Sequence, residues 1–261
     1  MSNLELKIKN ILADLKTNHN VVGLKSEFEA EGASCEETKY LADMAKSAGL
    51  NFTVKIGGCG AVNDIRISKS LDADILVAPM IESSFAVQKF VESVDIVYEN
   101  SKQPKLLINI ETVSGMNCFD EIIESPYYDR ISGIVFGRSD MVKSLGKSCD
   151  ATESSEILEL AKSLSEKVLK SGKIFIVGGG ISPKSYDFLK SLEISNFETR
   201  KIIFDRCELD KDCQSGILKA LEFEIIWYRL KQELYGNISK SDIVRLDILQ
   251  RRYEAQALLN L

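Results

Sequence analysis

Short apolar segments alternate with helix-like segments along most of the chain, and this alternation constrains the fold more than any other feature. The expected strands are residues 21–28, 52–56, 74–79, 94–98, 105–111, 132–137, 173–178 and 198–204, of which 94–98 is the weakest. Near-continuous apolar strands separated by helices predict a parallel sheet covered by helices. Eight such units in about 200 residues predict an α/β fold, the (β/α)₈ TIM barrel. A doubly wound open sheet is the alternative.

Helical patterns also flank the predicted barrel. One covers residues 4–15, and two longer ones cover 217–235 and 243–259, with a break at Gly236 and Asn237. We therefore expect a single barrel domain over residues 1–261. Within it, residues 211–261 form a helical extension packed on the barrel or on an oligomer partner. This extension favours a homo-oligomer.

Composition argues against several classes of protein. The net charge of −6 disfavours a general nucleic-acid binder, because phosphate contacts need a basic surface. No apolar run approaches the roughly 18 residues of a membrane span, and the N-terminus lacks a signal peptide's apolar core. We therefore expect a cytoplasmic protein with no membrane partner. The six cysteines form no CxxC pair and indicate reduced thiols, and the single histidine, His19, is expected in a loop or at the surface.

Two acidic residues end predicted strands. Glu111 closes the run 106–110, and Asp140 follows the run 133–137, 29 positions later. Parallel strands deliver such residues to one edge of the sheet, where α/β enzymes place their chemistry. Two carboxylates meeting there suit a hard divalent cation such as Mg²⁺. The alternative is that both acids only cap helix N-termini.

The first predicted strand also runs into acidic residues. Period-two alternation places Glu27, Glu29 and Glu31 on one face, where three like charges need a cation or shared protons. Alternatively, the strand ends near Phe28, and Glu29 and Glu31 are solvated.

Further candidates follow other strands. Lys55 can neutralise a substrate carboxylate or form a structural ion pair, and the glycines after it, including Gly58, let a ligand approach backbone amides. The triple glycine at 178–180 is either a weak phosphate signal or a tight turn. Arg200 starts the last predicted strand and is expected near the bottom of the barrel.

Taken in order, these motifs resemble the HpcH/HpaI aldolase/citrate lyase family of the phosphoenolpyruvate/pyruvate barrel superfamily. The specific part is residues 105–146, with weaker similarity over about 20–205. The motifs are Ile108-Asn109-Ile110-Glu111-Thr112, Phe119-Asp120-Glu121-Ile122-Ile123, Gly133-Ile134-Val135-Phe136-Gly137-Arg138-Ser139-Asp140 and Ser144-Leu145-Gly146.

The resemblance implies roles for these residues. Glu111 and Asp140 would hold Mg²⁺ or Mn²⁺, and Asn109 would contact the substrate. Backbone amides around Gly137 and Ser139 would hold the substrate carboxylate. Arg138, which follows the strand glycine, is a further catalytic candidate.

Two departures from the family pattern concern the same site. The family's acid/base histidine falls at Gly32, and its acid pair falls near Glu29 and Glu31. Lys55 stands where the family has an arginine that grips the carboxylate. We therefore expect Glu31 or a metal-bound water to transfer the proton, with Lys55 as a catalytic residue and Glu29 and Gly58 near the substrate.

The expected function is a metal-dependent carbon–carbon lyase acting on a small 2-oxo acid. One alternative is a phosphoenolpyruvate- or acyl-CoA-using enzyme with the same site. Another is a catalytically silent barrel that serves as a binding subunit.

Overall fold

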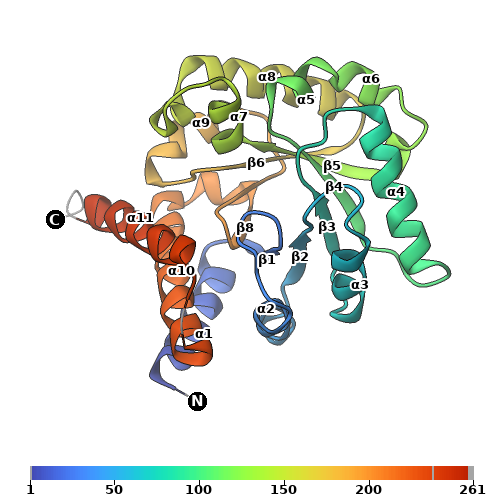
Figure 1. The fold of residues 1–261 in the computed structure, drawn as a ribbon. Helices are drawn as coiled ribbons and strands as arrows, with labels where there is room; N and C mark the ends of the chain where they lie inside the picture. The colour runs from blue at the N-terminus through green and yellow to red at the C-terminus, as the bar shows by residue number, and fades with distance from the viewer. Residues whose placement is uncertain (1, 237, 258–261) are drawn as a thin grey trace.

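The computed structural model describes residues 2–236 and 238–257 and confirms the predicted α/β barrel. Met1, Asn237 of the expected break and residues 258–261 of the expected extension lie outside the described residues. Eight strands close the barrel in chain order (Figure 1). They are β1 (Val21–Glu27), β2 (Asn51–Lys55), β3 (Ile75–Ala78), β4 (Lys105–Ile110), β5 (Ile131–Gly137), β6 (Ile174–Gly178), β7 (Asn196–Glu198) and β8 (Ile202–Asp205).

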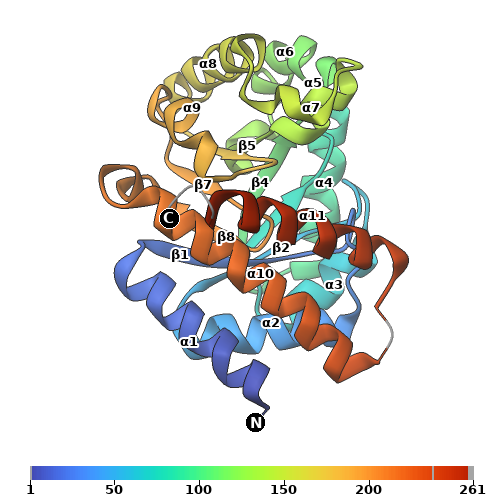
Figure 2. The same ribbon diagram turned by 90° about the vertical axis from the view of Figure 1, so that its left-hand side faces the viewer.

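Helices surround the barrel on its outside (Figures 1 and 2). Those between strands are α2 (Cys35–Ala48), α3 (Val62–Ser70), α4 (Ser84–Tyr98), α5 (Val113–Asn117), α6 (Phe119–Ile123), α7 (Arg138–Ser144), α8 (Ser155–Lys170) and α9 (Tyr186–Lys190). Their ends follow local sequence signals. Helix α2, for example, begins at a capping box between Ser34 and Glu37 and ends at Gly49 in the left-handed conformation. Within the described residues, no helix combines the length and apolar character needed to cross a membrane.

The prediction of a strand at residues 94–98, the weakest of the eight, is wrong. These residues form the last turns of α4, which buries Val87, Phe90, Val91, Val94 and Val97. Their spacing of three and four positions is that of one helix face. A short apolar run alone does not separate such a face from a buried strand.

The eighth strand comes instead from the segment predicted as one strand at 198–204. Residues 196–205 form a hairpin, in which β8 runs antiparallel to both β7 and β1. Only Thr199, Arg200 and Lys201 separate the two strands, which is too short for the crossover that a parallel pair requires. The tip of this hairpin therefore lies at the same barrel end as the carboxyl ends of β1–β7.

The interior of the barrel has an apolar layer and a polar layer. Val77, Leu107, Val135 and Ile176 pack together as a separate buried cluster. Two positions further along β4, the inward side chain is the polar Asn109, and Lys25, Glu27 and Lys55 of β1 and β2 also line the cavity at this end. This change of character marks the carboxyl end of the barrel as the place for a site.

The flanking helices pack on the barrel and on each other. Helix α1 (Asn3–Asn18) packs against the long α10 (Cys213–Tyr235), and α11 (Lys240–Ala257) lies along α10 (Figures 1 and 2). His19 lies in the short loop after α1, as one of the two expectations had it, but it is buried, with Nδ1 2.9 Å from Oε1 of Glu208. Lys231 of α10 joins Glu37 of α2 to Asp242 of α11.

Candidate active site

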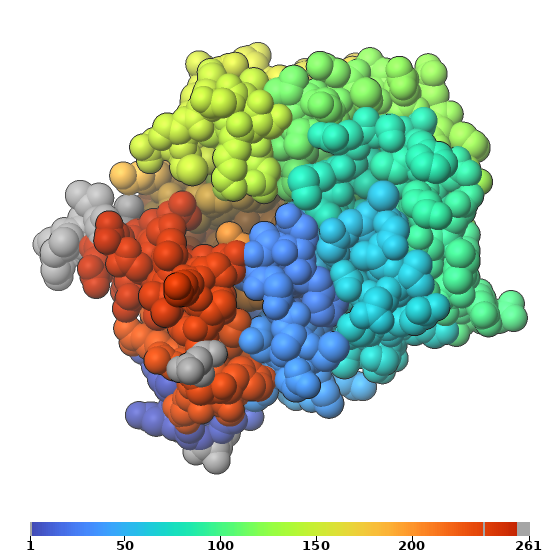
Figure 3. All heavy atoms as spheres, viewed as in Figure 1, coloured from blue at the N-terminus to red at the C-terminus, as the bar shows by residue number. Residues whose placement is uncertain are grey.

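A cavity of about 480 Å³ opens at the carboxyl ends of the strands. Figure 3 shows the surface hollowed where the red C-terminal helices meet blue N-terminal and yellow-green central segments. The lining includes the predicted residues Glu29, Lys55, Asn109, Glu111, Gly137, Ser139 and Asp140. Seven of the ten residues expected at the site therefore come together in one cavity.

Glu111 is held firmly at the end of β4. Its Oε1 accepts a hydrogen bond from the backbone N–H of Met80 at 3.0 Å, and its Oε2 accepts one from Nδ2 of Asn109 at 2.9 Å. Gly137 of β5 packs against it so closely that an added Cβ would lie 2.8 Å from the Glu111 Cβ. The cap of the next helix is Thr112, so Glu111 does not have the helix-capping role considered as an alternative.

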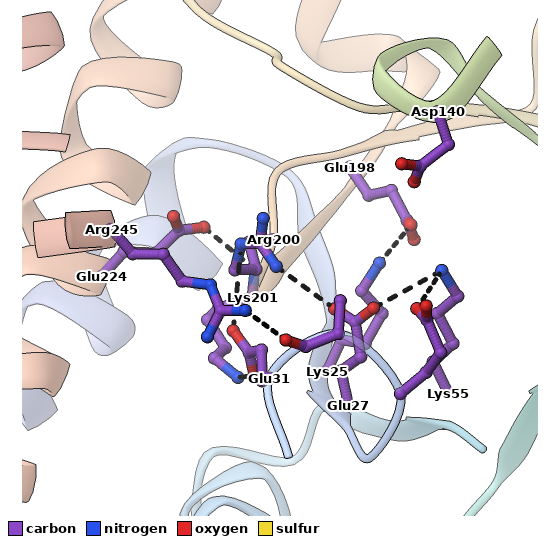
Figure 4. A network of polar contacts seen from close by, with 12 residues as sticks. Lys25, Glu27, Glu31, Lys55, Asp140, Glu198, Arg200, Lys201, Glu224 and Arg245 are labelled. Atoms are coloured by element: carbon purple, nitrogen blue, oxygen red, sulfur yellow. Dashed lines mark hydrogen bonds and ion pairs between the residues drawn. The ribbon is translucent and has the colours of Figure 1, made fainter. Parts of the chain in front are cut away.

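Asp140 lies in the first turn of α7, directly after β5. Its side chain is about half exposed, and Oδ1 is 2.8 Å from Nζ of Lys143. Figure 4 shows it projecting toward Glu198 from above. Glu111 and Asp140 therefore reach one cavity from neighbouring strands β4 and β5, one buried and one more open to solvent.

Lys55 lies among three carboxylates in the floor of the cavity. Its Nζ is 3.4 Å from Glu27, 3.2 Å from Glu29 and 3.5 Å from Glu111. Burial opposes the charge of Lys55, but attraction to Glu111, Glu27 and Glu29 raises its pKa overall. The ammonium group is therefore a permanent positive charge at the centre of the site.

The pKa values of Glu27 and Glu29 are shifted in opposite directions. Burial opposes ionisation of Glu27, but Lys55, Arg200 and Lys25 outweigh it and lower its pKa to about 2. Burial raises the pKa of Glu29, and its contact with Glu27 raises it further, against the pull of Lys55. Neighbouring carboxylates with separated pKa values are the pattern of a fixed anion beside a proton-transferring group.

Glu31, Gly58 and Arg138 lie outside the lining of this cavity. Strand β1 ends at Glu27, so its alternation does not extend to Glu31. The Glu31 carboxylate instead pairs with Lys201 and accepts a hydrogen bond from the Tyr228 hydroxyl at 3.3 Å. The expectation that Glu31 shares a face with Glu27 is therefore wrong.

Arg138 supports the triple-glycine turn from behind. Its buried guanidinium donates from Nε to the carbonyl of Gly179 at 3.1 Å and from Nη1 to Glu153 at 2.9 Å. The added Cβ at Gly179 would lie 2.6 Å from the backbone nitrogen of Ser139, so this turn packs tightly on the start of α7. Arg138 thus positions the loop from outside the cavity.

Sequence reasoning missed Lys25, Glu198 and Arg200 as site residues. Lys25 forms an ion pair with Glu198 across the interior, and Arg200 lies 3.5 Å from Glu27 (Figure 4). Lys25 lies two positions before Glu27 and could have been found by alternation. Arg200 was placed near the bottom of the barrel, which is wrong because the β7–β8 hairpin carries it to the top.

The donor set suits a hard divalent cation that is also bound by substrate or water. Oδ1 of Asn109 is buried and has no hydrogen-bond partner among the described residues. It lies beside the Glu111 carboxylate, and Mg²⁺ typically takes only one or two carboxylates together with other oxygens. Within residues 2–236 and 238–257, no group of three or more His, Cys, Asp or Glu side chains forms a complete protein cage for a metal.

The sequence profile of the HpcH/HpaI aldolase/citrate lyase family matches residues 40–177. Comparison with curated proteins gives no significant match. Solved structures share the fold. An HpcH/HpaI aldolase from Desulfitobacterium hafniense DCB-2 is 14% identical, covers 82% of this chain and 88% of its own, and has a TM-score of 0.59.

Two further structures are similar to the same extent. An HpcH/HpaI aldolase/citrate lyase family protein from Burkholderia cenocepacia J2315 is 12% identical, covers 74% of this chain and 83% of its own, and has a TM-score of 0.59. Citrate synthase SbnG is 15% identical, covers 82% and 89%, and has a TM-score of 0.55. At these identities the similarity shows the fold alone.

Proposed function

Because the chain belongs to the HpcH/HpaI aldolase/citrate lyase family, we propose that it is a metal-dependent carbon–carbon lyase acting on a small 2-oxo acid. The observation that carries the proposal is the arrival of Glu111 and Asp140 in one cavity, beside the unpaired buried Oδ1 of Asn109. These residues would hold Mg²⁺ or Mn²⁺. Bound there, such an ion supplies positive charge beside the oxygen that becomes negative when a pyruvate enolate forms.

The other residues of the chain would bind and orient the substrate. Gly137 and Ser139 line the cavity, and their backbone amides would bind the carboxylate of the pyruvate-like unit. Lys55 adds a buried positive charge that favours an anionic substrate, although its ammonium lacks the planar fork of an arginine.

Glu29, rather than Glu31, is the proposed acid/base group. It lines the cavity, and its raised pKa favours proton exchange. In the cleavage of a 4-hydroxy-2-oxo acid, Glu29 accepts the proton of the 4-hydroxyl group while the C3–C4 bond breaks and an aldehyde forms. The electron pair of that bond passes into the enolate, whose C3 then takes up a proton to give the 2-oxo acid.

A second candidate is the catalytically silent barrel. The Lys55 ammonium already lies within ion-pair distance of Glu27, Glu29 and Glu111, and the position of the family's histidine is Gly32. If the Lys55 ammonium occupies the place of the divalent cation beside Glu111, the barrel would bind no metal there.

An assay of the purified full chain separates the two candidates. The protein is tested with Mg²⁺ or Mn²⁺ for cleavage of 4-hydroxy-2-oxo acids and for decarboxylation of oxaloacetate. A lyase shows metal-dependent turnover that falls by about 100-fold or more in Glu111→Gln. Equal background rates with and without metal, in wild type and variant alike, favour the silent barrel.

Homo-oligomerisation and a cytoplasmic location remain part of the proposal. Exposed apolar side chains on α10 and α11 support an interface between copies; they are Leu234, Tyr235, Ile243 and Val244. The packing of α11 on α10, and of α10 on α1, supports one domain.

A further inference from the structure

The tip of the β7–β8 hairpin forms part of the cavity wall. Glu198, Thr199 and Arg200 line the cavity, and Lys201 follows them directly. A parallel pair of strands at this place would be joined by a crossover, usually through a helix, whereas here three residues from Thr199 to Lys201 connect β7 to β8. The family profile ends at residue 177. The tip therefore lies outside the part of the chain that the profile describes.

The backbone on either side of Arg200 is held by hydrogen bonds. The N–H of Thr199 donates to the carbonyl of Ile202 at 2.9 Å, and the N–H of Ile202 donates to Oγ1 of Thr199 at 3.2 Å. The N–H of Lys25 on β1 donates to the carbonyl of Lys201 at 2.8 Å. The tip is thus closed on itself and joined to β1.

Glu224 of α10 holds the same tip from the helix side. It is 1% exposed, and its Oε1 accepts a hydrogen bond from the backbone N–H of Lys201 at 2.9 Å (Figure 4). Burial raises the pKa of Glu224, against hydrogen bonds with the Thr199 side chain and the Lys201 backbone. A neutral carboxyl group still accepts a hydrogen bond through its carbonyl oxygen. The contact therefore needs an acceptor at this place more than it needs a negative charge.

The side chain of Arg200 is held less firmly than its backbone. Its Nη1 lies 3.5 Å from Oε2 of Glu27, and its Nε lies 3.9 Å from Oε1 of Glu31. The side chain is 37% exposed, and long ion-pair contacts of this kind hold a flexible side chain weakly. The place of the guanidinium therefore depends on where the backbone of the tip lies.

Glu27 is the group on which the Arg200 guanidinium acts. The other charged groups that face Glu27 are Lys55 on β2, Lys25 on β1 and the neighbouring Glu29. Burial opposes ionisation of Glu27, and the three cations lower its pKa to about 2 in spite of that. Arg200 is the cation that the hairpin contributes to this group.

We propose that Glu224 is a positioning residue, which fixes the hairpin tip so that the Arg200 guanidinium stays against Glu27 in the cavity wall. The consequence for turnover rests on the proposed function, because Glu27 adjoins the proposed acid/base group Glu29. The position of Arg200 itself does not depend on that function and can be measured without turnover.

The test follows the carboxyl carbon of Glu27 by NMR in the full chain labelled with ¹³C at glutamate, with Glu27→Gln to assign the signal. Loss of a positive charge makes a nearby carboxyl group ionise less readily, so Glu27 should titrate at higher pH in Arg200→Met than in wild type. Glu224→Leu should shift the titration in the same direction, and the double variant should match Arg200→Met. Loss of the Glu224 charge alone would shift it to lower pH, so an upward shift reports displacement of Arg200.

Two conservative variants separate the hydrogen bond from the charge. Glu224→Gln keeps an acceptor oxygen at the same reach, and Glu27 should titrate in it as in wild type. Glu224→Asp keeps the carboxyl group but withdraws it by one methylene, so it should shift Glu27 upward. This pair gives the answer even where Glu224→Leu fails to fold. Glu222→Leu is the matched control on α10, because Glu222 pairs with Lys7 and lies outside the cavity lining, and it should titrate like wild type.

The outcomes distinguish this inference from the proposed function. An unchanged Glu27 titration in Arg200→Met, an unchanged titration in Glu224→Asp, or a shift in Glu224→Gln as large as that in Glu224→Asp would overturn the inference. In an active enzyme, the acidic limb of the pH–rate profile should also move to higher pH in Arg200→Met and Glu224→Asp. The expected titrations without any turnover would overturn the lyase proposal and leave the positioning role of Glu224 standing.

Discussion

Nζ of Lys55 lies 3.5 Å from Oε1 of Glu111, and this contact joins β2 to the end of β4 across the barrel interior. The same ammonium group contacts Glu27 and Glu29. One buried cation thus lies among three acids and reduces the repulsion between them.

Replacing Lys55 should strongly destabilise the fold. Lys55→Met leaves three neighbouring carboxylates without their shared counter-charge, and breaking a buried pair in this way costs about 3–5 kcal/mol. Urea unfolding measures the free energy directly. Lys39→Ala is the control, because Lys39 pairs with Asp43 on the exposed side of α2 and should have little effect. Equal stabilities of the two variants would contradict this interpretation of the Lys55 cluster.

Gly137 should not tolerate a methyl group. In Gly137→Ala the new Cβ collides with the Glu111 side chain, including its Cβ at 2.8 Å, so Glu111 must move. We expect loss of divalent-cation binding by calorimetry even where the circular dichroism spectrum stays native. Gly58→Ala is the matched control, because an added Cβ there meets nothing within 4 Å. Wild-type cation affinity in Gly137→Ala would show that Glu111 needs no fixed position.

Glu29 and Glu31 should differ in their effect on turnover. Glu29→Gln removes the proposed proton acceptor and should lower kcat by about 100-fold or more. Because burial raises the Glu29 pKa above its ordinary 4.5, the acidic limb of the wild-type pH–rate profile should lie above pH 4.5 and vanish in this variant. Glu31→Gln should keep kcat, since its carboxylate faces Lys201 and Tyr228. The reverse pattern would return the acid/base role to Glu31.

Acid should weaken the fold through Glu27. Its folded pKa of about 2 lies below its ordinary value of 4.5, so the unfolded chain binds this proton more readily. Its ionisation therefore contributes stability above pH 4.5 that is lost as the pH falls toward about 2. Glu27→Gln should show a shallower loss of unfolding free energy through this window than wild type. The control is Asp43→Asn, at an exposed position. A wild-type slope in Glu27→Gln would contradict the assignment.

The barrel was predictable from sequence because most strands are continuous apolar runs ending in polar turns. Two predictions were wrong: a strand at 94–98 and a single strand at 198–204. Both errors arose because a run of apolar residues does not show whether it packs as a helix face or pairs as a strand. Val94 and Val97 face the barrel from a helix. The run 198–204 is divided by Arg200 and Lys201 into a hairpin that closes the barrel. The number of strands is still eight, because the strand lost at 94–98 is replaced by the second strand of the hairpin.

The site was predictable where side chains follow strand alternation and less so beyond strand ends. Asn109 on β4 and Glu111, the residue directly after it, line the cavity as alternation along this strand requires. Glu31 follows the end of β1, so its direction depends on Lys201 and Tyr228, which are distant in sequence. Arg252 reaches the cavity only because α11 packs along α10, a tertiary arrangement that local pattern does not specify.

The most direct test is a crystal structure of the full chain soaked with Mn²⁺ and oxalate, a mimic of the enolate, with anomalous diffraction locating the metal. We predict one Mn²⁺ peak between the carboxylates of Glu111 and Asp140, with oxalate bound to the ion, and loss of that peak in Glu111→Gln. A cavity in which the Lys55 ammonium keeps its three acid contacts at saturating Mn²⁺, with no anomalous peak between the two carboxylates, would contradict it.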